Sequence, residues 1–174
     1  ASIAMGQKNM EGAEKILSNC FTLLLGISVV LTVVLLPLRE PLLLCFGASG
    51  ETLPYAESYL AIYLCGTVFV QMSLGMNTFI TVQGRATISM LTVLIGAVIN
   101  IGLDPLFIYT FGMGVQGAAL ATVISQAVSC AWVLQFLFSR RSSLRIRREY
   151  LRPQWRVLAP VMALGLSPFI MQAT

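Results

Sequence analysis

ISMLTVLIGAVINIGLDPLFIY, residues 88–109, is an apolar run interrupted by a single charged residue, Asp104. A helix of about 20 apolar residues is long enough to cross the hydrocarbon core of a bilayer. A carboxylate at such a depth costs about 2.5–3.5 kcal/mol on insertion scales, so it is rarely found there without a function. Asn100 lies four residues earlier, on the same helix face, and Pro105 cannot donate the backbone hydrogen bond that a regular helix uses. The run predicts a membrane-spanning helix with an ion or proton site.

The composition of the whole chain also indicates a membrane protein. Hydrophobic residues make up 57% of the 174 residues and charged residues 10%, and the mean hydropathy is +0.84. An ordinary soluble domain is about 45–50% apolar and about 25% charged. Because a bilayer offers no water to the peptide groups, long apolar segments must bond internally as helices. We therefore expect an all-α, polytopic transmembrane bundle.

Apolar segments recur along the chain with polar connections between them. Pro41 and Pro54 are expected to bound the helices on either side of the connection 39–54. Because the chain begins without a Met and ends inside an apolar run, we expect it to be an internal fragment of a longer protein. The segments cover residues 16–38, 55–82, 88–109 and 115–138, and a fifth, truncated one begins near residue 157.

Basic residues are concentrated in one connection. Seven of the eleven lie between Arg140 and Arg156, and loops rich in Lys and Arg remain in the cytoplasm. Because consecutive membrane-spanning segments run in opposite directions, residues 1–15 and the turn 83–85 are then also expected on the cytoplasmic side. The clustering beside apolar segments predicts contacts of these arginines with anionic lipid headgroups and argues against a nucleic-acid partner.

The candidate coupling site combines two helices. Asp104 lies about 7–8 Å, and Thr122 about 10 Å, from the outer ends of their segments at 1.5 Å per residue. The tight turn at 111–114 makes the two helices antiparallel neighbours, so both residues reach one depth. Ala118 and Thr122 share a face and offer a carbonyl and a hydroxyl to Asp104. Together with Asn100 they predict a site for sodium or a proton; the alternative is a polar clamp between helices.

A candidate substrate surface lies on the preceding segment. Ser73 and Asn77 share a helix face, and methionines surround them, which suits an adaptable cavity for apolar cations. Gln126 extends the polar stripe of Thr122 inward, and Asn100 completes the predicted substrate set. Core filling with interhelical hydrogen bonds explains these residues equally well.

No catalytic motif is present in the sequence. It contains no histidine, which removes His-based triads and His–metal sites. It also lacks a GxSxG elbow and a P-loop. We expect neither an enzyme nor a cofactor beyond the coupling ion.

Several motifs resemble those of the multidrug and toxin extrusion (MATE) transporters. The most specific are GAVINIGLDP at 96–105 and GMGVQGAALAT at 112–122 with Ser125-Gln126, which resemble the fifth and sixth helices of that family. Weaker matches are FGA at 46–48, LPYA at 53–56 with Tyr59-Leu60, NTF at 77–79 with Gln83-Gly84, and GLSP at 165–168.

The resemblance implies a twelve-helix transporter with two six-helix lobes in the cell inner (plasma) membrane. It implies that residues 1–138 are the third to sixth helices of the first lobe, 139–156 a cytoplasmic interlobe loop, and 157–174 the start of the second lobe. The implied activity is export of organic cations and drugs, coupled to sodium or proton entry. The implied cation site contains Asn100, Asp104, Ala118 and Thr122, with Asn77 and Ser73 facing the drug cavity. The implied partners are small-molecule drugs, membrane lipids and the remaining helices, one of which carries a further aspartate.

Two other functions are compatible with this sequence. A lipid-linked oligosaccharide flippase or polysaccharide exporter of the same superfamily would use cavity arginines for anionic cargo, and no helix-embedded position here is Arg or Lys. A membrane scaffold without transport would gain little from Asp104 beside Asn100.

Overall fold

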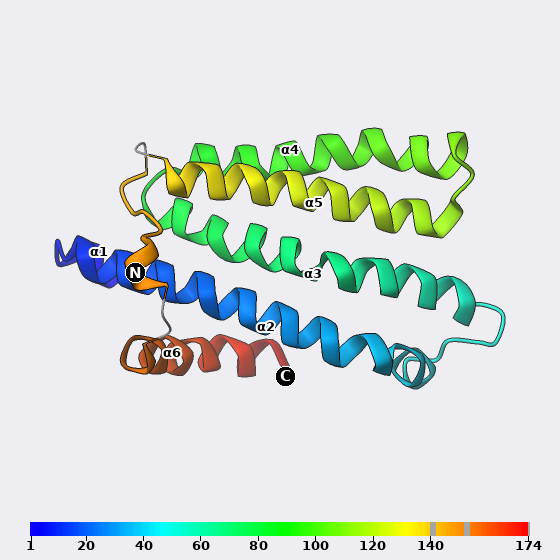
Figure 1. The fold of residues 1–174 in the computed structure, drawn as a ribbon, viewed down its shortest axis with the longest axis horizontal. Coiled ribbons are helices and arrows are strands. Elements are labelled where there is room, and N and C mark those ends of the chain that lie inside the picture. The colour runs from blue at the N-terminus through cyan, green and yellow to red at the C-terminus, as the bar shows by residue number, and fades with distance from the viewer. Residues whose placement is uncertain (140–141, 152–153, 174) are drawn as a thin grey trace.

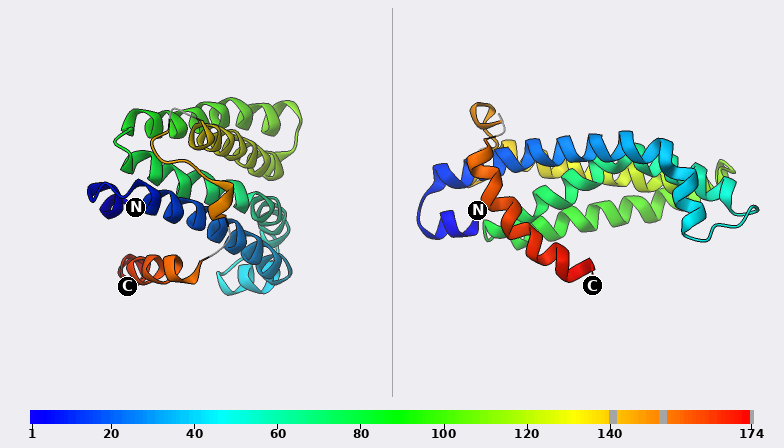
Figure 2. Two further views of the ribbon diagram at one scale, coloured as in Figure 1. Left: turned by 60° about the vertical axis from the view of Figure 1, so that its left-hand side comes forward. Right: turned by 90° about the horizontal axis from the view of Figure 1, so that it is seen from below.

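The computed structural model describes residues 1–139, 142–151 and 154–173. Within these ranges every regular element is helical, and Figures 1 and 2 show long helices lying side by side. The all-α prediction is confirmed. The elements are α1 (Ser2–Gly6), α2 (Met10–Cys45), α3 (Leu53–Val82), α4 (Ala86–Pro105), the π-helical turn η1 (Leu106–Thr110), α5 (Gly114–Phe138), the 3-10 turn η2 (Arg148–Tyr150) and α6 (Trp155–Ala173).

Four of the described helices are long and apolar enough to span a bilayer: Met10–Cys45, Leu53–Val82, Ala86–Thr110 and Gly114–Phe138. They contain the four complete apolar segments predicted from the sequence. In the bundle, α3 packs against α2 on one side and α5 on the other, and α4 packs mainly on α5 (Figure 1). The protein is therefore a multi-pass membrane protein.

The expected helix end before Pro41 is wrong. Helix α2 continues through Pro37 and Pro41 to Cys45, because membrane-spanning helices tolerate proline where the freed backbone groups find other partners. The helix ends two residues before Gly47, whose φ of 89° is left-handed and suits glycine just after a helix C-terminus. Pro54 does mark the start of α3, where it occupies the first turn.

The predicted irregularity at Pro105 is present. Helix α4 ends at Pro105, and the chain continues as a π-helical turn to Thr110. The Phe111 N–H then reaches back to the Leu106 carbonyl at 3.1 Å. Across this turn, a Cβ added to Gly117 would stand 3.0 Å from the Phe107 backbone. The small residue at 117 therefore allows α5 to approach the irregular end of α4.

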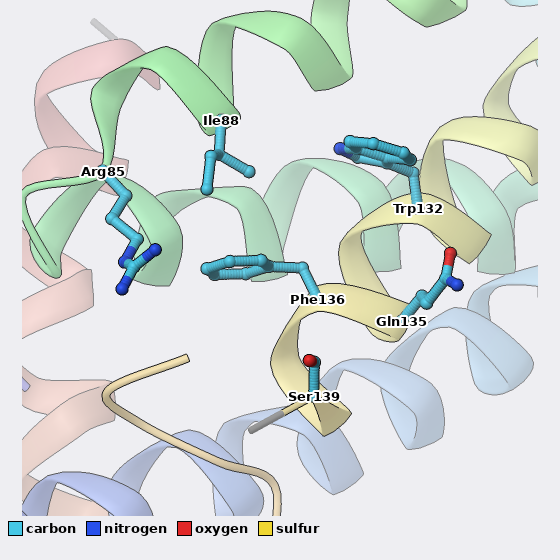
Figure 3. Close-up of a pocket in the computed structure, with 6 residues that line it drawn as sticks. All are labelled: Arg85, Ile88, Trp132, Gln135, Phe136 and Ser139. Carbon is cyan, nitrogen blue, oxygen red and sulfur yellow. The ribbon is translucent and has the colours of Figure 1, made fainter. Parts of the chain in front are cut away.

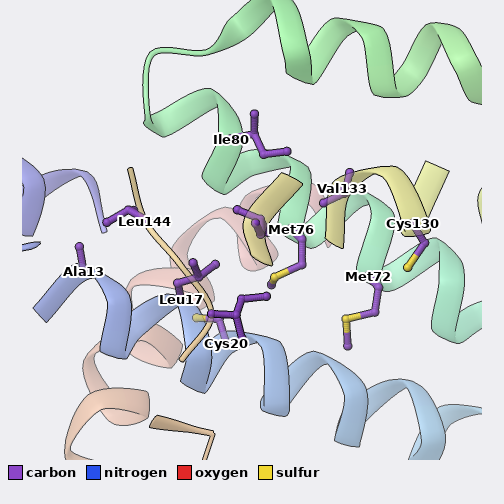
Figure 4. Packing of buried hydrophobic residues seen from close by; sticks show 11 residues of the cluster. Ala13, Leu17, Cys20, Met72, Met76, Ile80, Cys130, Val133 and Leu144 are labelled. Carbon is purple, nitrogen blue, oxygen red and sulfur yellow. The ribbon is translucent and has the colours of Figure 1, made fainter. Parts of the chain in front are cut away.

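The buried core lies at the end of the bundle where the loop after α5 crosses (Figure 4). Helices α2, α3 and α5 each contribute one stripe to it, and the loop contributes Leu144 and Ile146. The helical members are Ala13, Leu17, Cys20, Met72, Met76, Ile80, Cys130, Val133 and Leu137.

Residues 142–151 are bound to the bundle by one side chain in particular. The Gln83 Oε1 atom accepts hydrogen bonds from the Ser142 hydroxyl (2.9 Å) and from the backbone N–H groups of Ser143 (2.9 Å) and Leu144 (3.2 Å). A glutamine at the end of α3 thus caps three donors of a segment about 60 positions later in the chain.

Helix α2 holds the same segment through charged and polar side chains. Glu14, whose side chain is 10% exposed, pairs with Arg147 at 2.6 Å, and the Ser18 hydroxyl accepts from the Arg147 N–H at 3.1 Å. The Tyr150 hydroxyl donates to Glu11 at 3.2 Å. Partial burial and then this hydrogen bond raise the pKa of the Tyr150 hydroxyl above its ordinary value.

One of the loop arginines, Arg147, forms an ion pair with α2, and the expected contacts of the loop arginines with lipid headgroups stay a prediction. Arg140, Arg141 and Arg152 of the predicted loop lie outside the described residues, as does Thr174 at the end of the predicted second-lobe segment. The division into lobes stays a prediction.

Candidate functional site

A cavity of about 210 Å³ lies between α3, α4 and α5. The structure brings together five of the seven predicted site residues there: Ser73, Asn77, Asn100, Thr122 and Gln126. They come from three helices separated by long stretches of sequence. The cavity walls also include Thr92, Ser125 and Ser129, and none of the described lining residues is charged.

Asp104 stands beside this cavity rather than in its wall. The Asn100 side-chain amide donates to Asp104 Oδ1 at 3.3 Å, and Asn100 itself lines the cavity. Both side chains are partly exposed. Because the two residues are four apart on α4, the Asn100 amide can both line the cavity and bond to the Asp104 carboxylate.

Thr122 and Ala118 are joined by a hydrogen bond within α5, and their approach to Asp104 stays a prediction. The Thr122 hydroxyl donates to the Ala118 carbonyl at 3.0 Å. Its oxygen keeps acceptor capacity, since a hydroxyl has one donor and two lone pairs. Thr122 thus presents an acceptor to the cavity, whereas Ala118 lies outside the described lining.

Asn77 provides an acceptor with no partner of its own. Its Nδ2 atom donates to the Ser89 carbonyl at 3.2 Å, which fixes the orientation of the amide, because the opposite orientation would bring two oxygens together. Its Oδ1 atom is buried and has no hydrogen-bond partner among the described residues. An unpaired buried acceptor costs about 1–3 kcal/mol, and a ligand with N–H or O–H donors would recover that cost.

A hydrogen bond and a close approach in the cavity wall hold α4 and α5 together. Ser129 donates to the Thr92 carbonyl at 3.2 Å, and a Cβ added to Gly96 would stand 2.5 Å from the Ser129 hydroxyl. Sequence reasoning missed Thr92, Gly96 and Ser129. The sequence could have indicated Thr92 and Gly96, because residues 92, 96 and 100 are spaced four apart and therefore lie on one face of a helix.

Comparisons with known proteins agree with this architecture. The MatE family model matches residues 1–106. The multidrug export protein MepA of Staphylococcus haemolyticus is 31% identical over 150 residues, 86% of this chain and 33% of MepA. MepA of Staphylococcus aureus strain MRSA252 is 29% identical over 153 residues, 87% of this chain and 34% of that protein. The chain thus spans about a third of the length of these curated relatives.

Solved structures show the same arrangement of helices. The inward-facing conformation of a multidrug resistance MATE family transporter of the MOP superfamily superimposes with a TM-score of 0.88 at 31% identity, over 95% of this chain and 38% of that one. A MATE structure in the straight conformation superimposes with a TM-score of 0.90 at 30% identity, over 99% of this chain and 38% of that one. A third structure is that of a MOP superfamily transporter from Pyrococcus furiosus whose binding pocket is described as having reverse polarity. It superimposes with a TM-score of 0.88 at 31% identity, over 95% of this chain and 37% of that one.

Proposed function

Because this chain belongs to the MatE family, we propose that it is part of a secondary active transporter that exports organic cations and drugs in exchange for sodium or protons. The observation that carries the proposal is the Asn100–Asp104 pair, which connects an intramembrane carboxylate to a neutral polar cavity. Transport of this kind needs no catalytic residues and no cofactor other than the coupling ion. The proposed location is the plasma membrane.

Asp104 is the proposed coupling residue. A sodium ion prefers hard oxygen ligands: Asn100 Oδ1 and the Asp104 carboxylate are the candidate ligands on α4, and the Thr122 hydroxyl and the Ala118 carbonyl are the candidates on α5. A proton on Asp104 would neutralise the same charge. Either event removes the cost of a bare carboxylate in hydrocarbon and so changes the relative stability of two packings around Pro105. A ligand shifts such an equilibrium only by its differential affinity for the two states.

The cavity is the proposed substrate surface. At about 210 Å³ it is smaller than the roughly 300–1,000 Å³ of drug-sized sites, so in the complete transporter other helices would supply the opposite wall. Ser73, Asn77 and Gln126 offer hydrogen-bonding groups, and the unpartnered Asn77 Oδ1 favours a substrate with donors. An organic cation bound here would lie close to Asp104, so that drug and coupling ion compete.

The alternative is a flippase for lipid-linked oligosaccharides or a polysaccharide exporter. Such cargo carries phosphate or acidic groups, which Arg and Lys would bind. The described lining of this cavity contains neither. The lining therefore favours cationic or neutral substrates.

The test uses the complete transporter in proteoliposomes. Efflux of an ethidium-type cation is followed under an imposed sodium gradient and, separately, an imposed pH gradient. We expect one gradient to drive efflux, Asp104→Asn to abolish it, and Glu51→Gln, which changes an exposed carboxylate of the α2–α3 loop, to leave it intact. Full activity of Asp104→Asn would reduce Asp104 to a packing clamp, and wild-type protein without efflux under either gradient would favour the flippase.

A further inference from the structure

A second cavity, of about 540 Å³, lies farther along α4 and α5, near the start of α4 and the end of α5. Figure 3 shows Arg85 and Ile88 on one side of it, Trp132 and Gln135 on the other, and Phe136 between them. It shares none of its described lining residues with the cavity that contains Asn100. We propose that it binds the phosphodiester headgroup of an anionic membrane phospholipid, with Arg85 as the anchoring residue.

The guanidinium of Arg85 lies beside an aromatic ring of the cavity wall. Its Cζ atom lies over the Phe136 ring, 5.5 Å from the ring centroid, which is the distance of a cation–π contact. The N–H donors radiate in the plane of the guanidinium and match two oxygens of a phosphate. None of the carboxylates in the described part of the chain forms an ion pair with Arg85.

The charge around the cavity complements an anion. The sequence contains no Asp or Glu from residue 105 to residue 148, which covers the whole of α5, or from 58 to 103, which covers most of α4. The first turn of α4 carries no acidic residue, and Arg85 itself is its N-cap without a capping side chain. The positive end of the α4 dipole therefore adds to the Arg85 charge.

The walls of the cavity suit a lipid more than a free ion. Ile88, Phe136 and the partly exposed Trp132 form apolar surface beside the polar groups, and tryptophan favours the level of the headgroups in a bilayer. Basic pockets between transmembrane helices on the cytoplasmic side bind anionic headgroups, and the distribution of arginines predicts that this end of the bundle faces the cytoplasm.

The experiment uses the complete transporter in nanodiscs, in a variant that keeps Trp132 as its only tryptophan. Quenching of its fluorescence is compared between brominated phosphatidylglycerol and brominated phosphatidylcholine at equal mole fraction. We expect stronger quenching by phosphatidylglycerol, and an Arg85→Gln variant in which this preference falls about fivefold or more, the effect of one basic residue at a membrane surface. Lys8→Gln removes a charge on the same predicted side, outside the cavity lining, and should keep the preference.

Four results would overturn the proposal. Equal quenching by the two lipids would show apolar contact only, and quenching by neither would show that other helices cover the cavity. An unchanged preference in Arg85→Gln would exclude the anchoring role, and loss of the preference in millimolar inorganic phosphate would identify a small anion as the ligand. Where Arg85→Gln does not fold, Arg85→Lys keeps the charge and should retain part of the preference; complete loss there would count against a charge-based site.

Discussion

Replacing Gln83 by Met should release residues 142–151 from the bundle without unfolding the helices. The substitution keeps an unbranched side chain of similar length but removes the Oε1 atom that accepts from Ser142, Ser143 and Leu144. Gln83 lies at the C-terminal boundary of α3 and caps no donor inside a membrane-spanning segment. The damage should therefore be confined to the loop between α5 and α6.

The magnitude follows from the three bonds that are lost. Each contributes about 0.5–1.5 kcal/mol net. Ser143 is exposed and can bond to water, and the single proton of the Ser142 hydroxyl can be donated to the Leu144 carbonyl instead. The largest loss therefore falls on the part-buried Leu144 N–H, which is left without its acceptor. We expect the docked segment to lose about 1–3 kcal/mol, which increases its opening equilibrium about five- to 150-fold.

Hydrogen exchange of peptides covering residues 142–151 in the complete transporter measures that opening directly. The matched variant is Gln83→Glu, which keeps an acceptor oxygen at the position of Oε1 and replaces the Gln83 Nε2 atom, a buried group without a partner among the described residues. Exchange should accelerate in Gln83→Met and stay near wild type in Gln83→Glu. Identical exchange in all three proteins, or equal acceleration in both variants, would refute the reasoning.

Three further changes test the packing and the site. Glu14→Gln breaks the ion pair with Arg147; because that arginine is half-exposed, we expect a loss of about 1 kcal/mol, seen as a lower melting temperature, and a melting temperature equal to wild type would contradict it. Gly96→Ala should destabilise the α4–α5 contact by about 1–3 kcal/mol, whereas Gly102→Ala, with open space around its Cβ, should not; similar thermal stability of the two would argue against close packing. Asn77→Leu should weaken binding of a cationic dye about tenfold, the equivalent of one lost hydrogen bond to a charged group, as titrated by fluorescence anisotropy, and unchanged affinity would remove Asn77 from the substrate surface.

The sequence predicted the membrane-spanning helices well because their signal is local. Each is an apolar run whose length matches the bilayer, and α3, α4 with η1, and α5 begin and end within three residues of the expected positions. The error at α2 arose from Pro41, since a proline that usually ends a helix in water is tolerated in a membrane-spanning helix where the freed backbone groups find other partners. The actual stop signal was Gly47.

The candidate site was predictable only in part. The Asn100–Asp104 hydrogen bond follows from four-residue spacing within one helix, and the structure has it. The bond between Thr122 and Ala118 also lies within one helix, but spacing alone did not say which partner the hydroxyl takes. The roles of Thr92 and Ser129 depend on a contact between α4 and α5, which no single helix reveals.

By itself, the sequence determined that the chain spans a membrane several times as helices, and that one carboxylate interrupts an apolar run, because hydropathy, length and spacing are properties of a single segment. Only the tertiary structure decided that Ser73, Asn77, Asn100, Thr122 and Gln126 line one cavity, that Asp104 stands beside it, and that the basic loop is bound to α2 and α3. These arrangements depend on how helices rotate and approach one another. That rotation is set by small residues and interhelical hydrogen bonds between positions far apart in the chain.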